Sequence, residues 1–407
     1  MKRREIIAGL GSAGALALAA PLASHPARAA TRPVRIGVLT DMSGPASDLS
    51  GPGSVIAARL AVADAGPVLG HPVEIVVGDH QLKPAVGAEI AARWYDTQDV
   101  DLITDVTFSA VGLAVQGVAA KKKKLVIVSG TGADAFTGKL CTPYSMQWTF
   151  DTTALAAGTV ATLLKRGAKT FYFITADYAF GHSMENVATA MIHRKGGKVL
   201  GHSVFPYNTP DMSSYLVSAR SSGADVIAVA AGPPDDINCF KQAPSFGIGR
   251  GGNHQQLAAM LAFINDIHAI GLPIAQGLVL TTSFYWNLDA KTRAWSRRFS
   301  KLAHKQASMA QAGVYSSVLH YLRAVQASGT TDALAVAAKM RAMPVEDMFA
   351  RNGVLRADGL MVHDLLLVKV KTPARSHGPW DLYDVLDRIP CAEAFPPLQG
   401  EGCSLAT

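Results

Sequence analysis

The chain has 407 residues, of which 49% are hydrophobic and 17% are charged, so it can bury a large core and is too long for one ordinary domain. Without its first thirty residues it keeps 34 basic and 30 acidic side chains, and this mild excess, with no basic stripe among aromatic residues, argues against a nucleic-acid partner. The four lysines at 121–124 stand where a helix should end, a position that favours cations.

The first thirty residues have the pattern of an export signal. A basic start at 2–4 precedes a mildly apolar stretch, and Ala-Arg-Ala at 27–29 is a small-x-small cleavage site. The arginine pair at 3–4 and the weak hydrophobicity favour the twin-arginine route. An uncleaved membrane anchor is the alternative, which the interrupting glycines and Pro21 disfavour. We therefore expect a periplasmic protein that is cleaved near Ala29.

Strand and helix patterns alternate between residues 34 and 129. Apolar runs bounded by turn residues predict strands, and apolar residues at helical spacing predict helices. In chain order we expect a strand at 34–39, a loop at 43–53, a helix around 55–62, a strand at 72–79, a helix at 84–97, a strand at 100–106, a helix at 109–121 and a strand at 124–129.

A break at 141–152 separates this series from a second one of the same kind. We expect helices at 153–166, 181–195, 211–222 and 235–246, and strands at 170–176, 198–205, 225–231 and near 257–263. Next come an apolar segment at 277–283, helices near 290–303, 311–328 and 332–342, an apolar strand at 363–370 and an irregular tail. Because the strands are apolar on both sides, they should be parallel and covered by helices on two faces. The predicted fold class is α/β, with two doubly wound units.

Small hydroxyl residues follow two neighbouring strands of the first unit. Thr107 and Ser109 come after the strand at 100–106, and a Ser-Gly-Thr run at 129–131 follows the next strand. Loops at the carboxyl ends of parallel strands form the ligand crevice, and helices that begin there present free N–H groups. These loops therefore suit a carboxylate. Helix capping is the alternative, because Ser and Thr are preferred N-caps in any protein.

The sequence lacks a clear catalytic or metal-binding pattern. No G-x-S-x-G elbow follows a strand, no partner can be placed beside Ser129, and His182 has the setting of an ordinary surface residue. The four cysteines have neither C-x-x-C nor zinc spacing. We expect no enzyme activity, no cofactor and no metal. An exported chain favours disulfides, but four thiols allow three pairings.

The segments VRIGVLTDMSGPAS, VSGTG, TADYAFGHS and AGVYSSVLHYLRAV, in this order after an export signal, resemble the type I periplasmic substrate-binding proteins of ABC transporters. More narrowly, the chain resembles the leucine/isoleucine/valine-binding family. The resemblance implies two Rossmann-like lobes with a ligand cleft between them, joined by a hinge of three crossovers. The implied crossovers lie near 148–151, 282–286 and 356–361, so lobe 1 comprises 31–148 and 284–358, and lobe 2 comprises 149–283 and 359–407.

The resemblance also implies positions that bind the ligand. Ser43 would line the cleft, and a carboxylate would be held by Ser109 and by the Ser-Gly-Thr run at 129–131. Phe180 takes the place of a family tyrosine with Tyr178 nearby, and aromatic side chains would wall the pocket. Asp235, or Asp266, would pair with a ligand ammonium. The expected set is Ser43, Phe108, Ser109, Ser129, Gly130, Thr131, Tyr178, Phe180, Asp235, Phe263, Tyr285 and Trp286.

These features favour a small carboxylate with an aromatic or apolar body, such as a benzoate-like or phenylpropenoate-like acid. The family implies delivery to the membrane permease of an ABC importer, and we expect a monomer. A branched-chain or other apolar amino acid is the near alternative, followed by a ligand sensor of the same fold and by a secreted α/β hydrolase. Similar chains also favour a Cys141–Cys403 disulfide, with Cys391–Cys403 as the local alternative.

Overall fold

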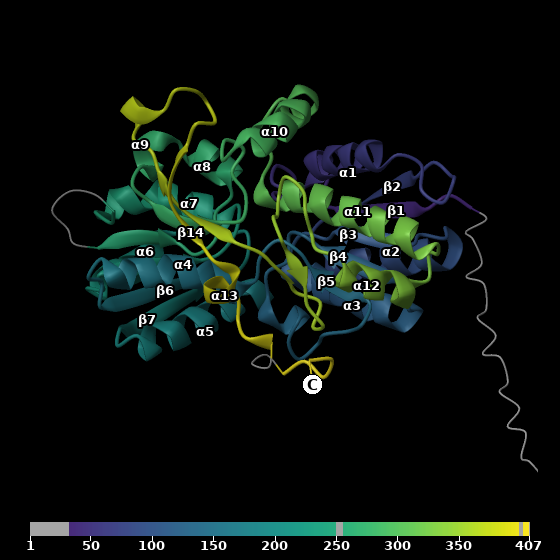
Figure 1. The fold of residues 1–407 in the computed structure, drawn as a ribbon. Helices are drawn as coiled ribbons and strands as arrows, with labels where there is room; N and C mark the ends of the chain where they lie inside the picture. The colour runs from purple at the N-terminus through teal and green to yellow at the C-terminus, as the bar shows by residue number, and fades with distance from the viewer. Residues whose placement is uncertain (1–31, 250–254, 399–401, 407) are drawn as a thin grey trace, which may run out of the picture.

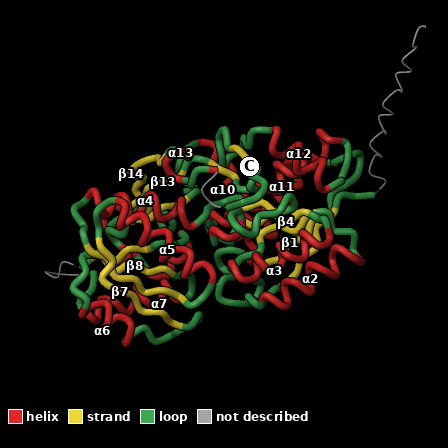
Figure 2. Tube along the Cα trace, turned by 90° about the horizontal axis from the view of Figure 1, so that it is seen from below, coloured by secondary structure: helices red, strands yellow, loops and turns green. Residues whose placement is uncertain are grey.

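The computed structural model describes residues 32–249, 255–398 and 402–406, and the predicted export signal lies outside them. Two lobes lie side by side, and the chain ends at the edge between them (Figure 1). Each lobe has a parallel sheet with helices on both faces (Figure 2). Within the described ranges, no helix is both long and apolar enough to cross a membrane.

The first lobe is built on five parallel strands in the order β2-β1-β3-β4-β5. Its elements are β1 (Arg35–Thr40), α1 (Gly51–Ala65), β2 (Glu74–Asp79), α2 (Pro84–Thr97), β3 (Leu102–Asp105), α3 (Ser109–Lys122), β4 (Leu125–Val128), β5 (Ser145–Gln147), α10 (Ala290–Ala303), α11 (Met309–Ser328) and α12 (Ala333–Ala342). Successive residues of β1 point to opposite faces. Val38 therefore packs with α1 and α11, whereas Leu39 packs with α2 and α3.

The second lobe repeats this plan with the strand order β7-β6-β8-β9, again parallel. Its elements are α4 (Thr152–Lys165), β6 (Thr170–Ala176), α5 (Ala179–Arg194), β7 (Lys198–Phe205), α6 (Ser213–Ser221), β8 (Val226–Ala230), α7 (Asp235–Gln242), β9 (Gln256–Ala259), α8 (Ile264–Ile270) and α9 (Leu272–Ala275). On β6, Phe173 faces α4 and α5, and Ile174 faces α6 and α7. The predicted α/β fold with two doubly wound units is confirmed.

A smaller antiparallel sheet, β10-β13-β14, completes the second lobe. It comprises β10 (Val279–Thr282), β13 (Leu365–Val370) and β14 (Tyr383–Ile389), and α13 (Cys391–Ala394) packs on α4 beside it. The short antiparallel pair β11 (Val354–Leu355) and β12 (Met361–Val362) precedes β13 in the chain and contacts α12 of the first lobe. The irregular tail expected after residue 370 is therefore wrong. Tyr383 is the one fully buried residue of β14, so the strand carries no apolar alternation that would reveal it.

Three connections join the lobes. The chain passes from β5 to α4, which lie in different lobes (Figure 1), and from β10, in the small sheet of the second lobe, to α10, which packs on α1 of the first lobe. On the third connection, Leu360 forms a parallel bridge with Gln147 of β5 shortly before β13 enters the lobe-2 sheet. The predicted residue boundaries of the lobes stay a prediction.

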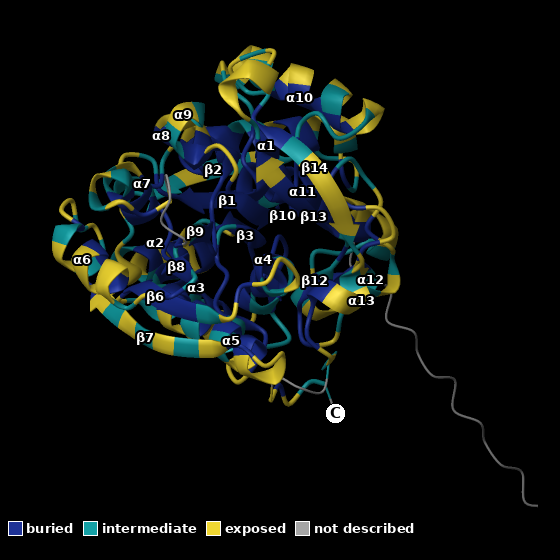
Figure 3. Ribbon diagram, turned by 90° about the vertical axis from the view of Figure 1, so that its left-hand side faces the viewer, coloured by how far each residue is buried: buried dark blue, intermediate teal, exposed yellow. Residues whose placement is uncertain are grey.

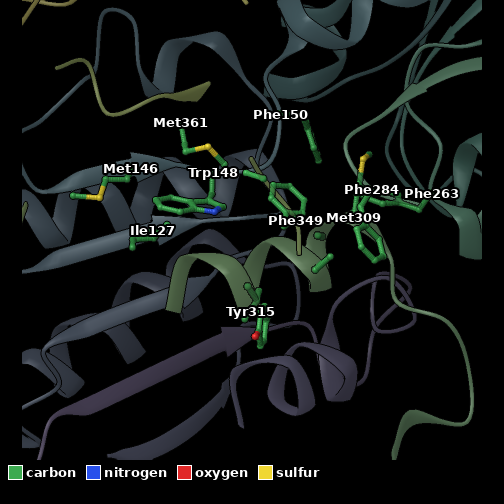
Figure 4. Packing of buried hydrophobic residues seen from close by; sticks show 14 of the residues in the cluster. Ile127, Met146, Trp148, Phe150, Phe263, Phe284, Met309, Tyr315, Phe349 and Met361 are labelled. Carbon is green, nitrogen blue, oxygen red and sulfur yellow. The ribbon is translucent and has the colours of Figure 1, made fainter. Parts of the chain in front are cut away.

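The largest apolar cluster continues from one lobe into the other beside these connections. Trp148 is fully buried, and its indole N–H donates to Ser316 Oγ at 3.0 Å. Phe150 and Phe263 meet edge to face with 6.2 Å between ring centroids (Figure 4). Buried residues fill the space between the sheets and their helices (Figure 3). The lobes therefore share packing where they meet.

A disulfide joins Cys141 to Cys403 across 262 residues of sequence, with Cα atoms 5.6 Å apart. The predicted pairing is confirmed, and the Cys391–Cys403 alternative is wrong. Cys239 and Cys391 are free thiols, the first of them buried. The bond ties the end of the chain to the segment before β5 in lobe 1.

Candidate ligand-binding site

A cavity lies where the carboxyl ends of strands from both sheets meet. The empty space amounts to about 410 Å³, part of it open to solvent. Loops that follow β1, β3, β4, β6, β7, β8 and β9 contribute to its wall. The lining residues are Ala46, Leu49, Thr107, Phe108, Ser109, Gly130, Gly132, Phe150, Tyr178, Phe180, Tyr207, Gly232, Pro233, Leu261 and Phe263. Ligands bind at this edge in open α/β sheets.

Two helices, one from each lobe, begin at the cavity. Helix α3 starts at Ser109 and α5 starts directly after Tyr178, and both of these residues line the wall. Neither first turn receives a side-chain cap from the described part of the chain. Their N–H groups and the positive ends of both helix dipoles are therefore available to an anion in the cavity.

Ser109 adds a hydroxyl donor at the start of α3. Its Oγ accepts hydrogen bonds from the N–H groups of Gly132 at 3.4 Å and Ala133 at 3.3 Å. A hydroxyl has two acceptor lone pairs and one proton. Because both lone pairs face N–H groups, the proton is the part of Ser109 left for a ligand, and it suits a carboxylate oxygen.

The loop between β3 and α3 has a strained backbone. Asp105, Val106 and Phe108 have φ angles of 76°, 47° and 79°, which are costly for residues other than glycine, most of all for the β-branched Val106. The Thr131 hydroxyl donates to the Val106 carbonyl at 2.8 Å. Thr131 thus supports the loop that carries Phe108, although its own side chain does not line the cavity.

Aromatic rings from opposite lobes meet at the cavity. Phe108 stacks on Tyr178 with 4.6 Å between ring centroids and 18° between planes, and it lies 4.9 Å from Tyr207. Phe180 stands behind Tyr178 at 6.1 Å. The faces of these rings are flat and apolar, and the distance between the Phe108 and Tyr178 rings is typical of an aromatic pair.

Polar contacts also join the lobes beside the cavity. The Asn265 amide of α8 donates to the Asp48 carboxylate at 3.0 Å, and the Ser183 hydroxyl of α5 donates to the Asp134 carboxylate at 2.8 Å. Together with the Phe108–Tyr178 stack, these contacts hold the lobes in a closed arrangement.

The structure brings half of the predicted site residues together around the cavity. These six are Phe108, Ser109, Gly130, Tyr178, Phe180 and Phe263. Ser43 is exposed and donates to Asp79, and the buried Ser129 Oγ has no hydrogen-bond partner among the described residues. Tyr285 and Trp286 pack instead toward the segment before β14, where they donate to the Asp381 carboxylate and the Trp380 carbonyl.

The two predicted acidic partners already have hydrogen bonds. The Asp235 carboxylate accepts from the N–H groups of Asn208 and Thr209, and the Asp266 carboxylate accepts from the Phe263 N–H. Burial raises the pKa of Asp235 to about 6 and that of Asp266 to about 7. Of the described residues, none of those that line the cavity is charged.

Several wall residues were not predicted from the sequence. Tyr207 follows β7, Gly232 and Pro233 follow β8, and Phe150 lies on the first connection between the lobes. Tyr207 could have been predicted as a wall residue from its position after a strand of the second sheet, because the carboxyl ends of parallel strands share one edge. Phe150 has no such signal. No cluster of three or more potential metal ligands exists among the residues whose placement is described.

Comparison with known proteins places this architecture in a family. The family model described as periplasmic binding protein matches residues 33–377. A curated relative, Leu/Ile/Val-binding protein homolog 6 of Brucella suis, is 23% identical over 265 residues, or 63% of this chain. The alignment spans 66% of that relative, just under two thirds of its length.

Solved structures extend the comparison to nearly the whole chain. A periplasmic binding protein from Burkholderia mallei is 45% identical with a TM-score of 0.89, covering 92% of this chain and 99% of the other. A branched chain amino acid ABC transporter periplasmic ligand-binding protein from Burkholderia xenovorans is 38% identical with a TM-score of 0.84, covering 92% and 100%. A solute binding protein from R. palustris in complex with benzoate shares the fold, with a TM-score of 0.81 at 18% identity and the same coverage.

Proposed function

Because the chain belongs to the periplasmic binding proteins of ABC transporters, in the Leu/Ile/Val-binding family, we propose that it binds a small carboxylate with an aromatic or apolar body. The ligand would lie in the cavity between the lobes, and the closed protein would deliver it to the membrane permease of an importer. We further propose that it acts as a monomer in the periplasm after cleavage near Ala29. This role needs neither a cofactor nor a metal.

One observation carries the choice of ligand class: two uncapped helix N-termini face a cavity whose wall is aromatic and, over the described residues, uncharged. The N-termini and the Ser109 proton suit a carboxylate. The stacked Phe108 and Tyr178 suit a flat body that enters between the lobes and separates the two rings. Closure on the ligand then follows from the higher affinity of the closed state.

A branched-chain or other apolar amino acid is the second candidate. It is supported by the relative from Burkholderia xenovorans, which is described as a branched chain amino acid transporter protein. Such a ligand carries an ammonium group that needs a carboxylate or carbonyl partner. The carboxylates of Asp235 and Asp266 accept backbone N–H groups instead, and this favours an acid without an ammonium group.

A sensor of the same fold would bind the same ligand and signal to a receptor instead of a permease, and a permease gene beside this one would argue for transport. A secreted hydrolase has less support, because the relatives are described as binding proteins. Steady turnover of ester or amide substrates that is lost in Ser129→Ala would revive it.

Thermal shift with a panel of aromatic acids, aliphatic acids and apolar amino acids tests the ligand class. A benzoate-like or phenylpropenoate-like acid should raise the melting temperature, because a ligand at 100 times its Kd adds about 2.7 kcal/mol to stability. The amide of the same acid, which lacks the carboxylate, is the matched control and should give no shift. Shifts confined to amino acids with a free ammonium group would contradict the aromatic-acid assignment.

The ring of Phe108 provides a sharper test of the aromatic body. Phe108→Leu removes the flat face and should raise the Kd of the best aromatic acid about tenfold, because aromatic pairing is worth up to about 1.5 kcal/mol beyond burial. Phe108→Tyr keeps the ring and should stay within about threefold of the wild type. Isothermal titration calorimetry measures both variants. Equal affinities for all three proteins would show that the ring does not contact the ligand.

A further inference from the structure

Six cationic side chains gather at the end of lobe 2 that lies farthest along β6 from the cavity. Two come from the end of α4 and two from the end of α5. The last two are the residue directly before β6 and the first residue of β7. We call this group, Lys165, Arg166, Lys169, Arg194, Lys195 and Lys198, the basic end. All six residues are exposed, and β7 is seen as a largely exposed strand in Figure 3.

The two loops that carry these residues are neighbours in space. The Lys198 N–H donates to the Lys169 carbonyl at 2.8 Å, and Thr170 pairs with Lys198 in the sheet. Helices α4 and α5 pack against each other on the same face of the sheet. The six cations therefore form one continuous surface instead of two separate clusters.

Acidic residues lie near the basic end without pairing with its side chains, and Asp387 and Glu393 line the same surface hollow as Lys165 and Lys195. Within the described ranges, none of its six side chains makes an ion pair or a side-chain hydrogen bond. At the corresponding end of lobe 1, Arg32, Arg35 and Lys122 pair with Asp101, Glu74 and Asp96, whereas Lys121, Lys123 and Lys124 have no ion pair with a described residue. The Asp225 carboxylate near Lys169 accepts the N–H groups of Lys169 and Thr170. Helix dipoles account for cations at the ends of α4 and α5, but they do not account for Lys169 and Lys198.

The basic end is separate from the cavity. It lies at the amino-terminal ends of β6 and β7, whereas Tyr178 and Tyr207 line the cavity beyond their carboxyl ends. Seven residues of β6 span about 23 Å. A partner at the basic end therefore leaves the cleft free to open and close.

We propose that the basic end docks on the anionic phospholipid surface of a membrane, which would hold the protein close to that membrane. Juxtaposed lysines and arginines are attracted to anionic leaflets over about a Debye length, at roughly a fivefold gain in binding per cation. Because the six cations project from the ends of four separate elements, a layer of anionic headgroups can contact them together without a matched acidic surface on a folded partner. The proposal requires only a periplasmic location and is independent of the ligand.

Co-sedimentation with vesicles tests this, using protein purified from the periplasmic fraction. The protein should bind vesicles of phosphatidylglycerol and phosphatidylcholine at about 0.1 M salt, and it should release them near 1 M salt, where the Debye length falls from about 10 Å to 3 Å. Pure phosphatidylcholine should not bind. Replacing four cations, Lys165→Glu, Arg166→Glu, Lys195→Glu and Lys198→Glu, should weaken binding by more than about tenfold.

The matched control reverses the four lysines of α3 and its C-terminal end, Lys121→Glu, Lys122→Glu, Lys123→Glu and Lys124→Glu, which gives the same net charge. It should keep most of the vesicle binding, and both variants should keep the wild-type ligand affinity. If the glutamate variant of the basic end does not fold, the four glutamine replacements test the same point. Equal loss in both variants, no binding by the wild type, or binding to an acidic polypeptide but not to vesicles would each overturn the proposal.

Discussion

Gly181→Ala should destabilise the protein by about 3 kcal/mol or more, because helix α5 approaches two strands at this residue. A Cβ atom on Gly181 would lie 2.1 Å from the carbonyl oxygen of Ala176 and 3.1 Å from that of Ala230. Both oxygens belong to the backbone of the lobe-2 sheet, at the ends of β6 and β8. They cannot rotate away as a side chain could, so the helix itself must move. Urea unfolding, followed by circular dichroism, measures the loss.

Gly117→Ala is the matched control for this substitution. Gly117 is exposed within α3, and a Cβ atom there would meet no other atom within 4 Å. Alanine should therefore stabilise the protein by about 0.5 to 1 kcal/mol, as expected for an open helical position. If Gly181→Ala unfolded at the same urea concentration as Gly117→Ala, the close approach of α5 to the strands would be contradicted.

The same substitution also bears on ligand binding. Gly181 lies in the first turn of α5, directly after the cavity residues Tyr178 and Phe180. A shift of α5 would move its free N–H groups away from the proposed carboxylate and would disturb the stack of Tyr178 on Phe108. We therefore expect the folded fraction of Gly181→Ala to bind the aromatic acid more weakly than the wild type.

The parallel sheets could be predicted from the sequence because their strands are buried on both faces. Strand β6 has six buried residues out of seven, and β8 is buried throughout, so each forms an apolar run. Strand β14 could not be predicted, because it lies at the edge of the small sheet with mostly exposed residues, and its apolar Val385 and Leu386 are adjacent and do not alternate with polar residues. Its pairing with β13 comes from tertiary contacts that local patterning does not encode.

The candidate site was likewise predicted only in part. Ser109, at a strand end, was predicted because topology alone brings such residues to one edge, whereas Phe180 was predicted from the family resemblance. Tyr285 and Trp286 also follow a strand, but β10 belongs to the antiparallel sheet, and its loop is turned toward Asp381 and Trp380. Sequence patterns locate strand ends, but they do not reveal which sheet a late strand joins.

Asp105→Asn should stabilise the protein at neutral pH, because the wild type buries a carboxylate there. Asp105 is fully buried at the end of β3, and its Oδ2 has no hydrogen-bond partner in the described part of the chain. The Thr107 hydroxyl donates weakly to Oδ1 at 3.4 Å. Asparagine has the same shape and tolerates the positive φ of this position.

The effect should depend on pH in a defined direction. Burial is the main cause that raises the pKa of Asp105 from 3.8 to about 6, and it outweighs the lowering effect of the nearby hydroxyl groups. Between these values the folded protein holds a proton that the unfolded chain has lost, so stability falls as pH rises from about 4 to 6 and is then constant. Asp105→Asn should therefore gain roughly 3 kcal/mol at neutral pH and nothing near pH 4.

The measurement is the difference in unfolding free energy between wild type and Asp105→Asn from pH 4 to 8. Other groups, such as His80, whose pKa burial lowers to about 4, titrate in both proteins and cancel in this difference. Asp225→Asn is the control of opposite sign, because N–H groups, first that of Lys169, lower the Asp225 pKa. It should destabilise at neutral pH. A difference for Asp105→Asn that does not change with pH would contradict the buried carboxylate.

Ligand binding should follow the same titration. Thr107 lines the cavity and bonds to Asp105, so an ionised Asp105 places a negative charge beneath the proposed site of the ligand carboxylate. The two negative charges repel each other in a poorly solvated setting. The Kd of the acid should therefore rise as pH increases through about 6 in the wild type, and this rise should disappear in Asp105→Asn. A ligand that binds equally well on both sides of this pH would have its carboxylate elsewhere in the cavity.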